Sequence, residues 1–145
     1  MSATDTAAWA ALLRVHAALV PRLDRELQAA CGLQLAWYDV LLELDSAPDR
    51  RLSMGELGQR AVVSRTRASR VVDALAAAGL VTRESNPDDR RSAYAMITEA
   101  GRARLGEAAP TYLAGVEEHF TSRMGGEESR TVAAALEKVL KTAAE

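Results

Sequence analysis

The sequence predicts a mainly α-helical fold with a small antiparallel β wing, in which a winged helix-turn-helix is joined to a helical lobe. Three observations predict this class. Apolar residues recur at helical spacing through most of the 145 residues. Two candidate helices follow each other closely in the middle of the chain, as in a helix-turn-helix. Directly after them, two short strand-like segments flank a turn that contains Asn, Pro and Asp.

The first predicted helix begins at Thr4, Asp5 or Thr6, any of which can cap it, and it ends at Gly32. Pro21 lies inside this segment and removes a backbone donor, so we expect one bent helix. Its apolar stripe consists of Trp9, Leu12, Leu13, His16, Leu19, Val20, Leu23, Leu27 and Ala30.

A second helix is predicted from Leu35 to Leu44, and the sequence Ser46-Ala47-Pro48 ends it. Its inward positions are Trp37, Val40, Leu41 and Leu44. Arg51 and Leu52 come next, and they can add a short third strand to the sheet of the wing.

The helix-turn-helix begins at Ser53, which can form a capping box with Glu56 before a short helix that reaches about Ala61. Val62 and Val63 then form the turn. The next helix has one buried stripe at positions i, i+3, i+4 and i+7, made of Ala68, Val71, Val72 and Leu75.

The wing follows Gly79, which is placed to end that helix. Strands are predicted over Leu80–Ser85 and Ser92–Ile97, with a turn that starts at Asn86-Pro87 between them. The tip of the wing is then Asp88–Arg91.

Thr98 is a plausible cap for a further helix that meets Pro110, where we expect a kink or a break, and that continues to Phe120. Gly125-Gly126 separates it from a last helix, whose apolar stripe is Val132, Leu136, Val139 and Leu140. The terminal helices carry more apolar surface than one small lobe needs. A second copy of the chain is therefore expected to cover this surface in a two-fold dimer.

The exposed side of the central helix combines hydroxyl groups with three arginines, and Asp73 projects from the same side. Such side chains contact both phosphate oxygens and base edges, so this face is suited to a groove of double-stranded DNA. The predicted contacts from this helix are Ser64, Arg65, Thr66, Arg67, Ser69 and Arg70.

The net charge of −2 is unevenly distributed along the chain. From Arg50 to Arg91 there are nine arginines and five acidic residues, which gives +4. The rest has 9 basic and 15 acidic residues, which gives −6. A basic middle between acidic ends indicates one lobe that faces phosphate and one that faces water.

The segment SMGELGQRAVVSRTRASRVVDALAAAGLVTRESNPDDRRSAYAMITEAGR resembles the DNA-binding lobe of the multiple-antibiotic-resistance regulator (MarR) family, and the other helices fit its dimerisation lobe. The sharpest element is Asp89-Arg90-Arg91, followed by Ile97-Thr98, where Ile97 replaces the family's usual leucine. The resemblance implies that Arg91 enters the minor groove and that Asp89 helps to hold the wing. Asp89, Arg90 and Arg91 thus complete the predicted DNA contacts.

The resemblance further implies one domain over residues 1–145, with a winged helix-turn-helix lobe at 33–98 and a dimerisation lobe at 1–32 and 99–145. It implies a homodimeric regulator, expected to be a repressor of a pseudo-palindromic operator that a small ligand or an oxidant releases. Effectors of the family, often aromatic or phenolic anions, bind between the two lobes. The residues predicted to line such a site are Trp9, Arg14, His16, Trp37, Tyr38 and Tyr112.

Other classes of function have less support in the sequence. His16 and His119 are the only histidines and show no metal-ligand spacing, so neither a metal nor a cofactor is expected and no catalytic group is evident. His16 on an apolar stripe and Cys31 beside Gly32 are interpreted as core residues. No apolar run is long enough for a membrane span, and a soluble cytoplasmic protein is expected. A winged-helix module that binds protein instead of DNA is the alternative function.

Overall fold

The computed structural model describes residues 6–61, 63–88 and 93–144. It confirms the predicted fold class, because helices dominate and a small antiparallel sheet forms the wing. The helices are α1 (Ala7–Cys31), α2 (Leu35–Ser46), α3 (Met54–Arg60), α4 (Arg65–Ala77), α5 (Glu99–His119) and α6 (Gly126–Ala144). The strands are β1 (Arg51–Ser53), β2 (Val81–Glu84) and β3 (Tyr94–Ile97). Short 3-10 turns lie at Pro48–Arg50 and Thr121–Arg123.

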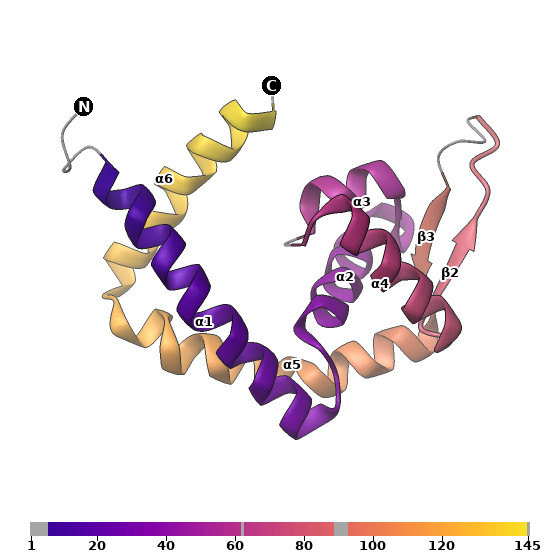
Figure 1. Ribbon diagram of the computed structural model, residues 1–145, viewed down its shortest axis with the longest axis horizontal. Coiled ribbons are helices and arrows are strands. Elements are labelled where there is room, and N and C mark those ends of the chain that lie inside the picture. Colours follow the sequence, from indigo (N-terminus) through magenta and orange to yellow (C-terminus); the bar gives the residue numbers. More distant parts are fainter. Residues whose placement is uncertain (1–5, 62, 89–92, 145) are drawn as a thin grey trace.

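The elements form two groups, and α5 runs along both (Figure 1). We call α2, α3, α4 and the sheet the winged lobe. We call α1, α5 and α6 the arm lobe. In Figure 1, α5 runs beneath both lobes, and the first half of α1 and the whole of α6 lie on the side away from the wing.

Most of the predicted helix boundaries are confirmed. Gly32 ends α1 in the left-handed conformation, with φ 66°, which glycine adopts without the steric cost of a Cβ. Ser53 and Glu56 form the capping box, with bonds of 3.1 and 3.3 Å between side chain and backbone. Thr98 caps α5 by accepting a hydrogen bond from the Gly101 N–H at 3.0 Å. Neither proline breaks its helix, because α1 contains Pro21 and α5 contains Pro110, so the break considered at Pro110 is wrong.

The wing sheet has the order β1-β3-β2, and both pairs are antiparallel. The third strand predicted at Arg51 and Leu52 is confirmed, since Leu52 lies opposite Ala95. The strand β2 begins one residue later and ends one residue sooner than predicted, whereas β3 begins at Tyr94 and ends at Ile97, the predicted end. The core of this lobe consists of side chains with 0% exposure from α2, α3, α4 and β3: Val40, Leu41, Leu44, Leu57, Val72, Leu75 and Ala95. Trp37, predicted to point inward, is only partly buried.

The arm lobe is held together where α1 crosses α5. Gly115 allows the close approach, because a Cβ there would lie 2.7 Å from Cδ2 of Leu23 and 2.8 Å from Oε2 of Glu26. One turn further, Nε2 of His119 is 2.6 Å from Oε1 of Glu26, and the His119 side chain is 5% exposed. The histidine whose side chain is buried is therefore His119. The prediction that His16 is a core residue is wrong for this protomer, because its position on the outer half of α1 leaves it exposed.

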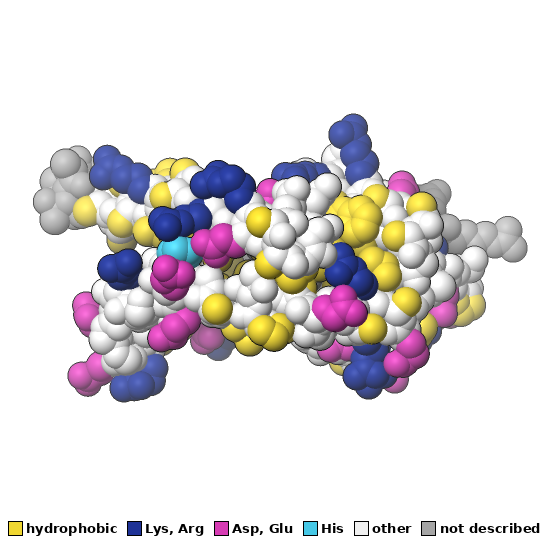
Figure 2. Space-filling view, turned by 90° about the horizontal axis from the view of Figure 1, so that it is seen from below, with side chains coloured by type: hydrophobic (Ala, Val, Ile, Leu, Met, Phe, Trp, Pro, Cys, Tyr) yellow, Lys and Arg dark blue, Asp and Glu magenta, His cyan; other side chains and the backbone are white. Residues whose placement is uncertain are grey.

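The outer parts of the arm lobe leave large apolar side chains exposed. These are Trp9, Leu12, Leu13 and Val15 on α1, Leu113 on α5, and Val132, Val139 and Leu140 on α6. Seen from below, the arms also carry many charged side chains of both signs (Figure 2). None of the described helices is long and apolar enough to span a membrane.

Candidate nucleic-acid interface and neighbouring cavity

The packing of α4 orients its polar side outward. Its predicted stripe of Ala68, Val71, Val72 and Leu75 is buried, as expected. Ser64 is the N-cap, and its Oγ accepts a hydrogen bond from the Arg67 N–H at 3.2 Å. On the opposite side, Ser69 is half-buried and the exposed residues are Ser64, Arg65, Thr66, Arg67 and Arg70. The structure thus leaves most of the predicted helix contacts exposed near the N-terminus of α4, where backbone N–H groups also favour anions.

Close packing of α3 against α4 positions the first of these arginines. A Cβ at Gly58 would lie 2.7 Å from Cγ of Arg65, so the stem of Arg65 rests directly on the α3 backbone. The aliphatic part of an arginine can cover apolar surface while its guanidinium stays in water. Arg65 is therefore held at the start of α4 with its charge exposed.

A side chain of the wing contacts α4 further along the helix, at Ser69 and Asp73. Nη2 of Arg83, on β2, lies 2.7 Å from Oδ1 of Asp73 and donates to the backbone and side-chain oxygens of Ser69 at 3.4 Å. Arg83 thereby joins the wing to α4. Sequence reasoning identified Ser69 and Asp73 as outward-facing but missed Arg83, because their pairing depends on where β2 folds back along the helix.

Three other contacts stabilise the wing. The guanidinium of Arg51 lies 4.7 Å from the centre of the Tyr94 ring and 3.7 Å from Glu84, so it ties β1 to the other two strands. At the turn, Oδ1 of Asn86 accepts a hydrogen bond from the Asp88 N–H at 3.0 Å. The wing residues Asp89, Arg90 and Arg91 lie outside the described residues, and their contact with DNA stays a prediction.

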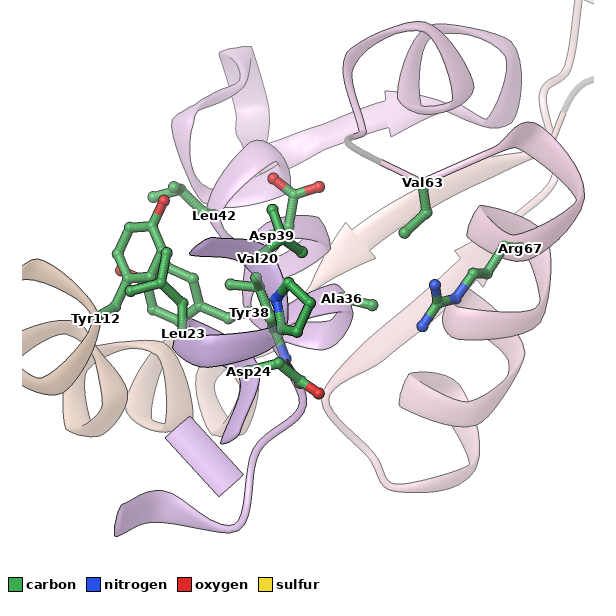
Figure 3. Close-up of a pocket in the computed structure, with 12 residues that line it drawn as sticks. Val20, Leu23, Asp24, Ala36, Tyr38, Asp39, Leu42, Val63, Arg67 and Tyr112 are labelled. Carbon is green, nitrogen blue, oxygen red and sulfur yellow. Dashed lines mark hydrogen bonds between the residues drawn. The ribbon is translucent and has the colours of Figure 1, made fainter. Parts of the chain in front are cut away.

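A cavity of about 340 Å³ lies between α1, α2, α5 and the start of α4 (Figure 3). Much of its wall is apolar and comes from both lobes, including Val20, Leu23, Leu35, Leu42 and Val63. Such a volume, with mostly apolar walls and a few polar groups, is typical of a small-molecule site.

Two tyrosines form one wall of the cavity. The rings of Tyr38 and Tyr112 are 4.5 Å apart between centroids and tilted by 33°. Burial raises the pKa of both phenols; Tyr112 raises that of Tyr38 further, and the charge of Asp39 adds to the rise at Tyr112. Both hydroxyls therefore keep their protons at neutral pH and can donate hydrogen bonds.

Charged side chains lie at the edges of the same cavity. The carboxylate of Asp24 is already hydrogen-bonded within the protein. Its Oδ1 accepts a hydrogen bond from the Leu35 N–H, and its Oδ2 accepts one from Nε2 of Gln28, both at 2.8 Å. Arg67 is different. Its guanidinium points from α4 toward the residues of α1 and α2 (Figure 3), and it makes no hydrogen bond or ion pair with any residue that the structure describes.

The structure brings together only part of the predicted ligand-binding set. Tyr38 and Tyr112 line the cavity, and Trp37 lies at a separate hollow beside α4, together with Arg67 and Arg70. The remaining members, Trp9, Arg14 and His16, are exposed on the outer half of α1 and line neither space. Sequence reasoning missed Arg67 as a cavity residue because helical spacing does not show how the start of α4 lies against α1.

Other chemistry has little support in the part of the chain that is described. Sγ of Cys31 lies 3.7 Å from Oγ1 of Thr111 and is partly buried. Among the described residues, no group of three or more His, Cys, Asp and Glu side chains could hold a metal ion.

Comparison with protein families and curated relatives places the same segments in a known group. The family model described as MarR family matches residues 32–92. The transcriptional repressor YetL of Bacillus subtilis is 34% identical over 82 residues, which cover 57% of this chain and 49% of YetL. The repressor MprA of Escherichia coli is 28% identical over 98 residues, or 68% of this chain and 55% of MprA. The chain thus spans about half the length of these curated relatives.

Solved structures match along nearly the whole chain. A MarR family transcriptional regulator of Streptomyces coelicolor, solved in complex with DNA, is 30% identical with a TM-score of 0.84, over 98% of this chain and 92% of its own. The regulator AbsC from the same organism is 29% identical with a TM-score of 0.82, over 98% of this chain and 95% of its own.

Proposed function

Because the chain belongs to the MarR family of transcriptional regulators, we propose that it binds double-stranded DNA sequence-specifically and represses transcription as a homodimer. The observation that carries the proposal is the start of α4, where three arginines and the hydroxyl-bearing residues Ser64 and Thr66 are all exposed. These groups match phosphate oxygens and the base edges of the major groove. The role is that of a DNA-binding regulator and not of an enzyme.

The exposed apolar side chains of the arm lobe support the proposed homodimer. Its exposed large apolar side chains lie on three helices that leave them unburied within one protomer. A second copy would bury them, and two-fold symmetry would present two α4 helices to half-sites about 34 Å apart. We therefore propose that residues 33–98 form the DNA-binding lobe, and that residues 1–32 and 99–145 form the dimerisation lobe.

The cavity beside Tyr38 and Tyr112 is the proposed effector site, so the protein would be a ligand-responsive repressor. Residues of both lobes line this cavity, which lets a bound ligand favour one arrangement of the two. A ligand changes DNA affinity only as far as it prefers one of the two states. The predicted residues Trp9, Arg14 and His16 would then take part only through other surfaces, because they do not line this cavity.

Selection of bound duplexes from a random pool tests the DNA proposal, followed by titration of the recovered duplex in a fluorescence anisotropy assay. Enrichment of a pseudo-palindrome, with affinity that Arg65→Ala weakens, would support it. Recovery of no preferred sequence, with affinity independent of salt, would instead favour the protein-interaction module.

A further inference from the structure

We infer that Arg67 couples the effector site to DNA, because a single guanidinium serves as the cation of the cavity and as a phosphate contact of α4. An anionic ligand in the cavity would hold Arg67 and remove it from the DNA surface. This inference rests on the proposed function and specifies how the effector site would control it.

The position of Arg67 supports the double role. It is the third residue of α4, beside the predicted DNA contacts Arg65 and Thr66. It also lines both spaces next to that helix: the cavity with Tyr38 and the hollow that contains Trp37. Of the three arginines at the start of α4, Arg67 alone lines the cavity.

The Arg67 guanidinium can bind either an anionic ligand in the cavity or a phosphate of DNA. Within the described residues its side chain has no hydrogen bond or ion pair, although Asp24 and Asp39 line the same cavity. An arginine guanidinium is a rigid planar fork that pairs with one carboxylate or phosphate through two parallel bonds. If it is paired with a ligand inside the cavity, the same fork cannot pair with a phosphate outside. The two interactions therefore compete.

The lining of the cavity indicates the class of ligand. Leu23, Leu42 and the two tyrosine rings suit a flat apolar body, and the phenol hydroxyls can donate hydrogen bonds. Both oxygens of Asp24 already accept hydrogen bonds from the protein, so this carboxylate does not need a cationic ligand. The unpaired charge is that of Arg67. The expected ligand is an aromatic or similarly apolar molecule with one carboxylate or related anion at the α4 end.

Calorimetry with matched probes tests the binding half of the inference in the absence of DNA. The probes are 2-naphthoate, the neutral 2-naphthamide and the cationic 2-naphthylmethylamine. We expect naphthoate to bind the wild type tightest of the three, and Arg67→Gln to weaken naphthoate by roughly 10-fold to 100-fold while hardly changing naphthamide. The assignment would be overturned if the wild type preferred the amine, or if Arg67→Gln weakened the binding of naphthoate and naphthamide equally. It would also be overturned if naphthoate did not bind the wild type up to the millimolar range.

Anisotropy with the selected duplex tests the coupling half. For the wild type we expect naphthoate to weaken DNA binding by roughly 5-fold to 150-fold, and DNA to weaken naphthoate by the same factor. Arg67→Gln should bind DNA less tightly and should lose this coupling. Coupling that survives Arg67→Gln at saturating naphthoate would overturn the inference.

Arg65→Gln is the matched control, because it removes a neighbouring α4 arginine that does not line the cavity. It should weaken DNA binding but keep both the naphthoate affinity and the coupling factor. Failure of the proposed function has a different signature, since the wild type would then bind no duplex while the calorimetry still reports on Arg67.

Discussion

The two lobes differ in how completely each one buries its own apolar residues. The winged lobe has a closed core, with Leu41, Leu44, Leu57, Val72 and Leu75 at 0% exposure. The arm lobe buries apolar side chains mainly along the contact of α1 with α5, whereas Val139 and Leu140 of α6 are 62% and 67% exposed. A helix with one apolar stripe needs a surface to cover it. The difference teaches that one protomer completes the core of the winged lobe, whereas its arm lobe keeps the exposed apolar surface that the proposed partner would cover.

The largest effect is expected from salt, which acts on the basic winged lobe. If a dimer makes about 6–10 phosphate contacts, its affinity for the selected duplex should fall by roughly 10³–10⁵ between 50 and 200 mM salt, because binding releases condensed counterions. Anisotropy titrations at several salt concentrations measure the slope. The proposed dimer interface is apolar, so the dimer equilibrium should change far less over the same range. A flat salt profile for DNA would contradict the assignment of the basic lobe to phosphate.

A substitution in the closed core of the winged lobe should have the next largest effect, and it should act on the free energy of unfolding. Leu75→Ala is expected to lower the free energy of unfolding by about 2–5 kcal/mol, since it leaves a cavity where the side chain is fully buried. Leu140→Ala removes the same atoms from a site that is 67% exposed in the protomer, so it should change the dimer equilibrium more than the stability of the winged lobe. Urea unfolding at several protein concentrations separates the two effects. Equal, concentration-independent losses would mean that Leu140 is covered within its own chain.

A charged residue placed on the exposed apolar stripe of α6 should separate the protomers of the proposed dimer. Val139→Glu would put a carboxylate into the proposed dimer interface and is expected to weaken association by at least about 2 kcal/mol. Lys138→Glu changes a residue of α6 outside the apolar stripe of Val132, Leu136, Val139 and Leu140; it is the control and should leave the dimer intact. Sedimentation at micromolar concentration distinguishes the 15.6 kDa protomer from a particle of twice that mass. A wild type that sediments as a monomer would remove the dimer from the proposal.

Single DNA contacts should have intermediate effects. Arg65→Ala or Arg70→Ala is expected to cost about 1–3 kcal/mol of DNA affinity and to relax base preference wherever the side chain reaches a base edge. Arg25→Ala removes a charge that is also exposed, from α1, and serves as the control. Binding assays with the selected duplex and with single-base variants measure both quantities. Equal losses for the α4 and α1 variants would indicate only a general effect of charge.

Local signals made the winged lobe predictable from the sequence. Ser53 with Glu56, Thr98, and the stripe that ends at Leu75 each depend on residues within one or two helical turns, and the structure has all of them. Features that depend on the meeting of distant elements were missed. His16 and His119 lie on helices of similar pattern, yet only His119 meets Glu26 of the other helix. From the sequence, only the location of the cavity between the lobes could be predicted. The side chains that line it could not all be identified, because they depend on the angle at which the two lobes meet.

The smallest expected effect concerns Arg83, which links the wing to α4 of the same lobe. Its bond to Asp73 is short, at 2.7 Å, but the two side chains are 36% and 66% exposed, so water and salt weaken the attraction. A double-mutant cycle with Arg83→Ala, Asp73→Ala and both changes should give a coupling of about 0.2–1 kcal/mol. The cycle is needed because each single change also alters the charge near DNA. Measured on the free energy of unfolding, the coupling reports how far the pair stabilises the lobe; measured on DNA affinity, it reports how far a fixed wing helps α4 to bind. A coupling present in unfolding but absent in DNA binding would show that the wing positions itself without Arg83, and that the bond only adds stability to a lobe whose core is already closed.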